Sequence, residues 1–168
     1  MFIYDHYGAD PDSVIIKDGE LEEGEEDDLL LYDVLLSFID EDLSVNENYE
    51  RFSRVMDVQS MAEYCAAQIY IGNSDWAMGK NEGLWLSRDD SFNQGRWQYI
   101  LYDTEYSSGL YGFEENSAGT DHFQKALETH PLFASTIHNP SFQTLFLDVL
   151  RLISMLRFRS GKWTSIKV

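Results

Sequence analysis

Residues 56–105 read MDVQSMAEYCAAQIYIGNSDWAMGKNEGLWLSRDDSFNQGRWQYILYDTE, and this stretch decides the fold. Its first part carries apolar residues at helical spacing from Met61 to Ile71. Asp57 is a strong N-cap candidate for this helix, and Gly72 is suited to end it. Two segments with strand character follow, at residues 83–86 and 96–102. The polar segment between them predicts a two-strand antiparallel hairpin with a long loop.

Other elements are expected on both sides of this stretch. Upstream, the sequence predicts a strand at Val14–Ile16, a helix over residues 29–39 and a second helix with Asn46 as its N-cap. Downstream it predicts helices at residues 122–127, 131–137 and 141–157, the last with Pro140 in its first turn. The order of elements predicts an α+β fold, mostly helical, in a single domain over residues 1–168.

The charge limits the classes of partner. The 168 residues include 30 Asp plus Glu against 12 Lys plus Arg, a formal net charge of -18. Nucleic-acid binding is disfavoured, because neutralising phosphates requires basic residues, and so is docking on an anionic membrane. Basic protein segments and divalent cations are the expected partners. The sequence contains no signal-peptide pattern at residues 1–10 and no apolar run long enough to span a membrane.

Three further features allow only structural expectations. Residues 18–28 read DGELEEGEEDD and predict a solvated, mobile loop kept open by charge repulsion. The alternative is a metal-binding loop, but the spacing lacks the pattern of an EF-hand. Cys65 is the only cysteine, so no internal disulfide or cysteine zinc site can form, and a buried inert thiol is expected. The tail from Arg157 to Val168 is basic, and the sequence leaves open whether it frays or binds the acidic surface.

Polar residues able to bind a metal ion or transfer a proton lie in two segments of the chain. Asn73, Asp75 and Asn81 follow the long helix, and Asp103 and Glu105 follow the second strand. Because the hairpin folds back on itself, we expect Asn81 and Asp103 to be neighbours. Phosphoryl transfer needs Mg²⁺, which prefers oxygen ligands, and an Asp that orients the acceptor hydroxyl. The order Asp, Asn, hairpin, Asp is that of protein kinases, with one extra residue between Asp75 and Asn81.

The chain resembles the spore-coat protein H (CotH) kinase family of atypical protein kinases, from about Val14 to about Leu152. The segment VIIKDGELEEG is similar to the family's entry into its C-terminal lobe. The stretch ending in GNSDW is similar to its helix and Asn-x-Asp-Trp motif, and WQYILYDTE to its second strand and Trp-Asp-x-Asp motif. NPSFQTLF is similar to a late Asn-Pro-x-Phe helix.

The resemblance implies a protein-kinase-like C-lobe that uses ATP and Mg²⁺ or Mn²⁺ to phosphorylate Ser of a protein substrate. It implies that Asp75 is the catalytic Asp, that Asn81 and Asp103 bind the metal and nucleotide, and that Glu105 is a third metal ligand. Glu105 departs from the family's Asp and is one methylene longer. Family members also carry an N-terminal nucleotide-binding lobe, so we expect this chain to represent the C-lobe portion, with little activity alone.

Other interpretations remain open. The resemblance also allows a non-catalytic, pseudokinase-like binding module of a bacterial surface or coat assembly, and points to the cell envelope, spore surface or secretion. A third possibility is a hydrolase that uses Asp75 together with Asp103 or Glu105. In structural terms, Asp75 could cap a turn and Asp103 could form an Asx turn. Three tryptophans are expected in the core rather than stacked on a ligand: Trp76, Trp85 and Trp97. The histidines are expected to be structural or exposed: His6, His122, His130 and His138.

Overall fold

Four antiparallel strands form one sheet in the computed structural model, which describes residues 13–89, 92–112 and 118–159. The order is β2-β1-β3-β4. The bounds are β1 Ser13–Lys17, β2 Glu20–Glu23, β3 Gly83–Ser87 and β4 Gln98–Ile100. The hairpin expected from the sequence is β3–β4, which pairs Leu84 with Tyr99. The sheet is larger than that hairpin, because β1 pairs with β3 along its whole length.

The acidic run contains one of these strands, so the expectation of a loop throughout residues 18–28 is wrong. Asp18 and Gly19 make a turn with positive φ, and β2 returns alongside β1 with Leu21 opposite Ile16. Glu20 and Glu22 are exposed and alternate with the partly buried Leu21 and Glu23, which is the pattern of an edge strand with one solvated face. A 3₁₀ helix, Glu26–Asp28, completes the run.

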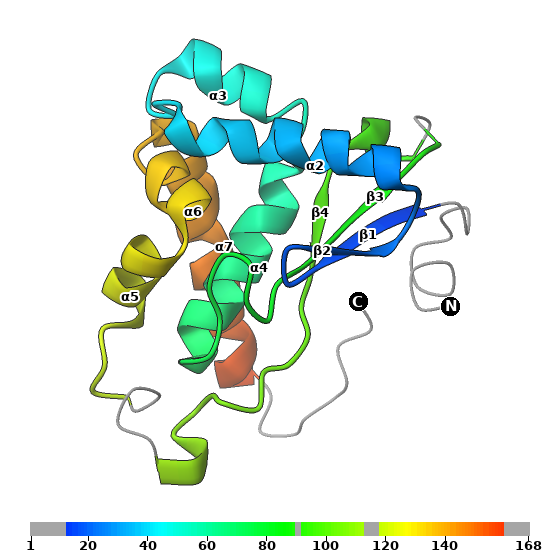
Figure 1. Cartoon of the computed structure of the whole chain (residues 1–168). Helices are drawn as coiled ribbons and strands as arrows, with labels where there is room; N and C mark the ends of the chain where they lie inside the picture. The colour runs from blue at the N-terminus through cyan, green and yellow to red at the C-terminus, as the bar shows by residue number, and fades with distance from the viewer. Residues whose placement is uncertain (1–12, 90–91, 113–117, 160–168) are drawn as a thin grey trace.

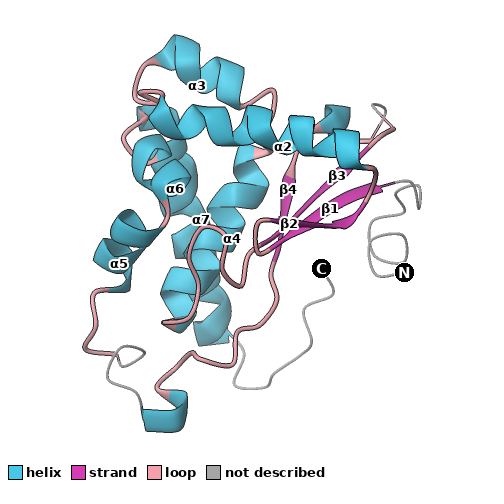
Figure 2. Cartoon of the chain, in the orientation of Figure 1, coloured by secondary structure: helices cyan, strands magenta, loops and turns pink. Residues whose placement is uncertain are grey.

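The helices gather on one side of the sheet (Figures 1 and 2). Their bounds are α2 Leu29–Leu36, α3 Asn46–Phe52, α4 Val58–Ile71, α5 His122–Thr129, α6 Pro131–Thr136 and α7 Pro140–Arg159, with a 3₁₀ helix Ser37–Asp40 after α2. Asp57 caps α4 as expected, since its carboxylate accepts hydrogen bonds from the amides of Gln59 and Ser60. Asn46 is not a cap: Val45 holds that position, and the side-chain oxygen Oδ1 of Asn46 accepts a hydrogen bond from Asn139 Nδ2 instead.

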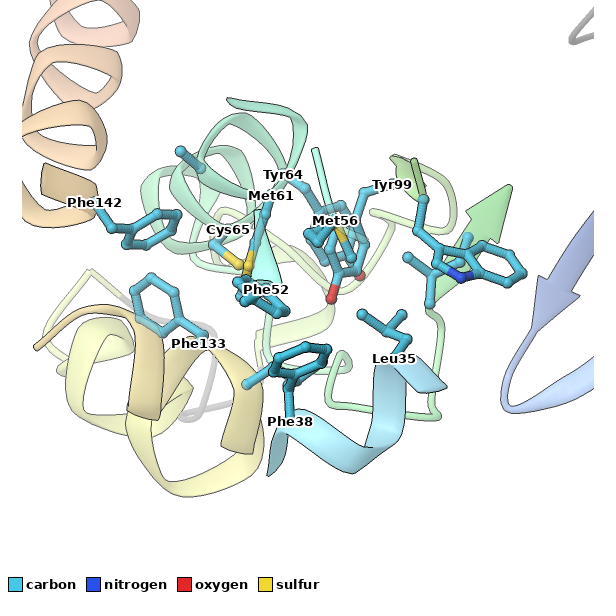
Figure 3. Packing of buried hydrophobic residues seen from close by; sticks show 14 of the residues in the cluster. Leu35, Phe38, Phe52, Met56, Met61, Tyr64, Cys65, Tyr99, Phe133 and Phe142 are labelled. Carbon is cyan, nitrogen blue, oxygen red and sulfur yellow. The ribbon is translucent and has the colours of Figure 1, made fainter. Parts of the chain in front are cut away.

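Helix α4 is central to the hydrophobic core. It packs along α7 and against β4, and Figure 3 shows its Met61, Tyr64 and Cys65 among the buried side chains. The rings of Tyr64 and Tyr99 are stacked with centroids 4.4 Å apart. Cys65 is fully buried, and burial raises the pKa of its thiol well above the ordinary value, which confirms the expected inert thiol.

All three tryptophans expected in the core are buried: Trp76, Trp85 and Trp97. Trp97 precedes β4 and pairs with the segment before α4, donating its amide to Val55 and accepting from Asp57. This pairing explains why β4 begins at Gln98, after the start of the strand expected over residues 96–102. Among the described residues, no helix is both long and apolar enough to cross a membrane.

The loop that follows α4 and the segment that follows β4 both lie at the C-terminal end of α4. Gly72 ends the helix in the left-handed conformation, with φ of 64°, and the chain continues into the loop that leads to β3. After β4 the chain comes back past the same helix end, where the Ser108 amide donates to the Ile71 carbonyl at 2.8 Å. The Ser74 amide likewise donates to the Tyr106 carbonyl at 3.0 Å. The loop after α4 and the segment after β4 therefore lie side by side.

Candidate functional site

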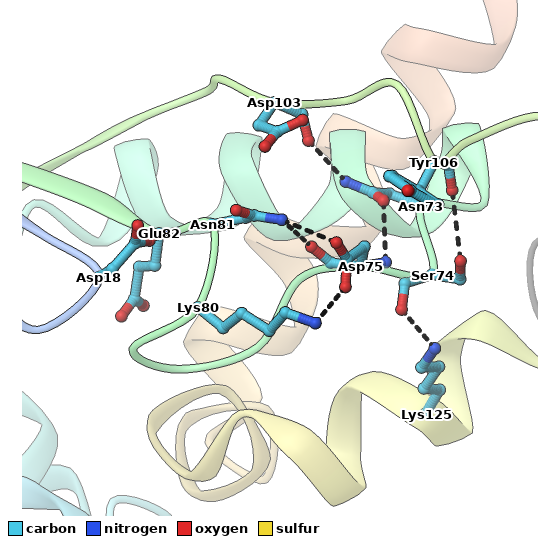
Figure 4. Close-up of polar contacts among 10 residues, drawn as sticks. All are labelled: Asp18, Asn73, Ser74, Asp75, Lys80, Asn81, Glu82, Asp103, Tyr106 and Lys125. Carbon is cyan, nitrogen blue, oxygen red and sulfur yellow. Dashed lines mark hydrogen bonds and ion pairs between the residues drawn. The ribbon is translucent and has the colours of Figure 1, made fainter.

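Asn73 joins the two segments at the end of α4 (Figure 4). Its side chain is fully buried. The amide nitrogen Nδ2 donates to Gln68 Oε1 at 2.8 Å and, at 3.4 Å, to the backbone carbonyl of Asp103. Its oxygen Oδ1 accepts from the Asp75 amide at 3.0 Å. One buried side chain thus fixes the start of the loop and the position of Asp103 together, which is a positioning role rather than a ligand role.

Asp75 and Asn81 are in direct contact. Asn81 Nδ2 donates to the Asp75 carbonyl at 2.7 Å and to the Asp75 carboxylate oxygen Oδ2 at 3.1 Å. Asn81 has φ of 48°, a left-handed conformation that Asn tolerates better than most residues. The turn that ends at Asn81 therefore directs its amide back toward Asp75, and the one extra residue between them does not prevent the contact.

Lys80 completes this group. Its ammonium forms an ion pair with Asp75 Oδ1, while the Asp75 side chain is 29% exposed. The hydrogen bond and the negative charge of Asp75 raise the pKa of Lys80. Both carboxylate oxygens of Asp75 consequently have a partner, one in Lys80 and the other in Asn81.

Asp103 lies beside this loop, but Glu105 does not join the group. Asp103 is exposed, with φ of 47°, and its contact to the loop runs through its backbone carbonyl, which leaves its carboxylate at the surface. Glu105 is also exposed and makes no hydrogen bond or ion pair with another described residue. The described parts of the chain hold no group of three or more His, Cys, Asp or Glu side chains placed to bind a metal ion. The ligand set of Asn81, Asp103 and Glu105 remains a prediction.

Comparison with protein families agrees with the motifs around Asp75 and Asp103. A family model described as CotH kinase protein matches residues 8–164. The chain belongs to the CotH kinase family. No curated protein and no solved structure matches it. Membership in the CotH kinase family establishes a kinase-type family for this chain, whereas the kinase-like C-lobe architecture remains a prediction.

This CotH kinase family member also contains a buried pair of polar residues that we did not predict from the sequence. Glu82, 2% exposed, lies directly after Asn81, and His130, fully buried, lies between α5 and α6. Glu82 Oε1 is 3.0 Å from His130 Nε2, and Glu82 Oε2 accepts from the Gly79 amide at 2.7 Å. The residues are far apart in sequence, so only the position of His130 before Pro131, typical of a helix start, could have drawn attention to it.

A second unpredicted contact comes from α5. Lys125 Nζ donates to the Ser74 carbonyl at 2.6 Å. This ties the first helix of the C-terminal half to the residue directly before Asp75 (Figure 4). The loop of this CotH kinase family member is thus held from three sides, by α4, by the segment after β4 and by α5.

Proposed function

We propose that this CotH kinase family member transfers a phosphoryl group from ATP to a Ser hydroxyl of a protein substrate, with Mg²⁺ or Mn²⁺ as cofactor. The observation that carries the proposal is the contact between Asp75 and Asn81. It places a carboxylate and an amide, the two side-chain types that orient the hydroxyl and hold the metal in kinases, in one loop beside Asp103.

Asp75 is the residue proposed to act on the substrate hydroxyl. Its carboxylate is partly buried and held in place by Asn81, yet it remains accessible from the surface. A Ser hydroxyl that displaces Lys80 from Oδ1 could donate its hydrogen bond to that oxygen. Asp75 then orients the hydroxyl and accepts its proton while the Ser oxygen forms a bond to the γ-phosphorus of ATP. The bond from that phosphorus to the β–γ bridging oxygen breaks, and ADP leaves.

Asn81 and Asp103 are the proposed metal ligands, and their donor atoms fit Mg²⁺. Asn81 turns Nδ2 toward Asp75, so its Oδ1 faces away from that contact (Figure 4). The Asp103 carboxylate is at the surface. Mg²⁺ typically binds proteins through one or two carboxylates and completes its shell with phosphate and water oxygens. When bound, the metal would neutralise charge on the phosphates.

The substrate class follows from charge. The net charge of -18 favours association with basic segments, since complementary charge raises the rate of encounter. A basic, Ser-rich peptide is therefore the substrate that we propose to test, together with a neutral Ser peptide of equal length. A faster reaction of the basic peptide, reduced by added salt, is the expected result.

The test is a phosphotransfer assay with the purified chain, Mn²⁺ or Mg²⁺, ATP and the basic peptide, read by the mass of the peptide. We expect Asp75→Ala and Asp103→Ala to reduce transfer by about 100-fold or more. Glu63→Ala, which removes an exposed acid on α4, is the matched control and should be unaffected. Absence of calorimetric binding of Mn²⁺ and ATP even when the chain is extended upstream, or transfer that persists in both variants, contradicts the proposal.

The ion pair of Lys80 with Asp75 favours a second candidate, a non-catalytic binding module of a surface or coat assembly. In that case Lys80 would neutralise the carboxylate permanently, and Glu105 would have no metal to bind. The same assay separates the two candidates. A chain that binds Mn²⁺ and ATP but transfers no phosphate under any condition tested supports the second candidate.

A further inference from the structure

The buried pair of Glu82 and His130 connects three parts of the molecule. The Glu82 carboxylate contacts the loop before β3 through Gly79 and the corner between α5 and α6 through His130. The Glu82 backbone contacts the turn between β1 and β2: its amide donates to Asp18 Oδ1 at 3.1 Å, and its carbonyl accepts from the Asp18 amide at 2.8 Å. A buried carboxylate is costly unless several donors satisfy it, and here they come from separate elements.

The hydrogen bonds of His130 assign its proton. The Phe133 amide donates to Nδ1 at 3.3 Å, so Nδ1 must offer a lone pair. The imidazole proton is therefore on Nε2, where it points toward Glu82 Oε1 at 3.0 Å. His130 thus caps α6 with one nitrogen and donates to Glu82 with the other. The hydroxyl of Tyr99, a residue of β4, lies 3.3 Å from His130 Nε2.

The second oxygen of Glu82 holds the turn that presents Lys80 and Asn81. Ala77 and Lys80 exchange backbone hydrogen bonds of 3.1 Å, and Gly79 lies within that turn with φ of 74°. The Gly79 amide points inward to Glu82 Oε2 at 2.7 Å. Movement of this turn would displace Lys80 and Asn81, the two residues whose side chains contact the Asp75 carboxylate.

We propose that Glu82, oriented by His130, is the positioning residue that holds Asn81 and Lys80 in contact with Asp75. The inference rests on the proposed function, because it assigns Asp75 and Asn81 to the reacting site. Glu82 itself contacts neither substrate nor metal. Its carboxylate accepts a hydrogen bond from the Gly79 amide and thereby fixes the turn that orients Asn81 toward Asp75.

The decisive variant is Glu82→Gln, which keeps the volume of the side chain. A carboxamide has one acceptor oxygen, so it cannot accept from both Gly79 and His130, and its NH₂ must face one of the two donors. We expect the chain to fold with α7 amide signals like those of the wild type. We expect the Gly79 amide to exchange with solvent about tenfold faster and the Asn81 side-chain amide signals to shift in NMR spectra. Glu63→Gln makes the same change at an exposed position and should alter neither signal.

A binding measurement then separates positioning from structural support. Calorimetry with Mn²⁺ and ATP should show a loss of affinity of about 10- to 100-fold in Glu82→Gln, as for other groups that orient metal ligands. A folded Glu82→Gln chain with wild-type Gly79 and Asn81 signals overturns the proposal. A displaced turn with unchanged affinity for Mn²⁺ and ATP also overturns it.

Glu82→Asp covers the case in which Glu82→Gln does not fold. It keeps the charge but withdraws the carboxylate by one methylene, so the same shifts of the Gly79 and Asn81 signals are expected. Wild-type signals in that variant overturn the proposal. The NMR measurement needs neither ATP nor metal. If the wild-type chain binds neither, even when it is extended upstream, the proposed function fails, while the NMR result alone still decides whether Glu82 positions the turn.

Discussion

At the scale of single residues, two glycines share a left-handed backbone but differ in their surroundings. Gly72 ends α4 with φ of 64°, and Gly79 turns the loop with φ of 74°. A Cβ added at Gly72 would lie 2.8 Å from Nε2 of His122, whereas one added at Gly79 would meet nothing within 4 Å. Comparing the two separates the cost of the backbone conformation from the cost of the steric contact.

We predict that Gly72→Ala is more destabilising than Gly79→Ala. Gly79→Ala should lower the free energy of unfolding by about 1 kcal/mol, the cost of a left-handed conformation for a residue with a Cβ. Gly72→Ala should lower it by at least about 1 kcal/mol more, because the His122 ring must also move. Urea denaturation followed by circular dichroism measures both. Equal effects would show that the His122 ring yields without cost.

Some residues of the candidate site could be predicted from the sequence, and others could not. Asp75, Asn81 and Asp103 could be chosen because polar residues at the ends of a hairpin stand out in the sequence. Glu82 could not, since it follows Asn81 directly and its role depends on His130, which is 48 positions away. Buried polar pairs of this kind depend on tertiary packing, for which a single sequence provides no periodic signal.

At the scale of elements, the 3₁₀ helix Glu26–Asp28 is fastened to the end of β3 by Asp28. Its carboxylate accepts from the Glu25 amide at 2.6 Å and forms an ion pair with Arg88. Burial acts to raise the pKa of Asp28, but the hydrogen bonds from Arg88 and Glu25 and the charge of Arg88 outweigh it and lower that pKa. The acidic run is therefore anchored at both ends, by strand pairing in β2 and by Asp28.

We predict that Asp28→Asn lowers the free energy of unfolding at pH 7 by about 1 kcal/mol, since the Asp28 side chain is only partly exposed. The pKa is lower in the folded state than the ordinary 3.8, so this contribution is complete above pH 3.8 and is lost as the pH falls through the folded value. The difference between variant and wild type should therefore shrink toward zero in acid.

Urea denaturation at a series of pH values measures this difference. Asp27→Asn, at the exposed neighbouring position, is the control for the loss of one charge and should show a smaller effect at every pH. A difference between Asp28→Asn and wild type that stays constant below pH 3.8 would contradict the assigned pKa direction.

Most elements could be predicted, but β2 could not. The helix capped by Asp57 and the strand at Val14–Ile16 have clear apolar periodicity, and both are present. In β2 only Leu21 is apolar, so its segment looks like a solvated charge run. The strand forms because β1 offers it a partner and its glutamates can point to solvent, which is a property of the sheet rather than of the segment.

At the scale of the whole molecule, the net charge of -18 opposes compaction. We predict that NaCl raised from about 0.01 M to about 0.15 M at pH 7 increases the free energy of unfolding, because the screening length falls from about 30 Å to about 8 Å. Chemical denaturation by urea at both salt concentrations measures the change. Choline chloride should give the same increase, whereas an unchanged or lower free energy in either salt contradicts the prediction.

The acidic strand β2, at the edge of the described sheet, also affects self-association of the protein. An open strand edge is a template on which a second chain can add its own strand. Two copies of β2 approaching edge to edge would bring Glu20, Glu22 and Glu23 against their counterparts, and like charges opposite each other are unfavourable. The acidity that disfavours nucleic-acid binding therefore acts, at this edge, against self-association and fibril growth.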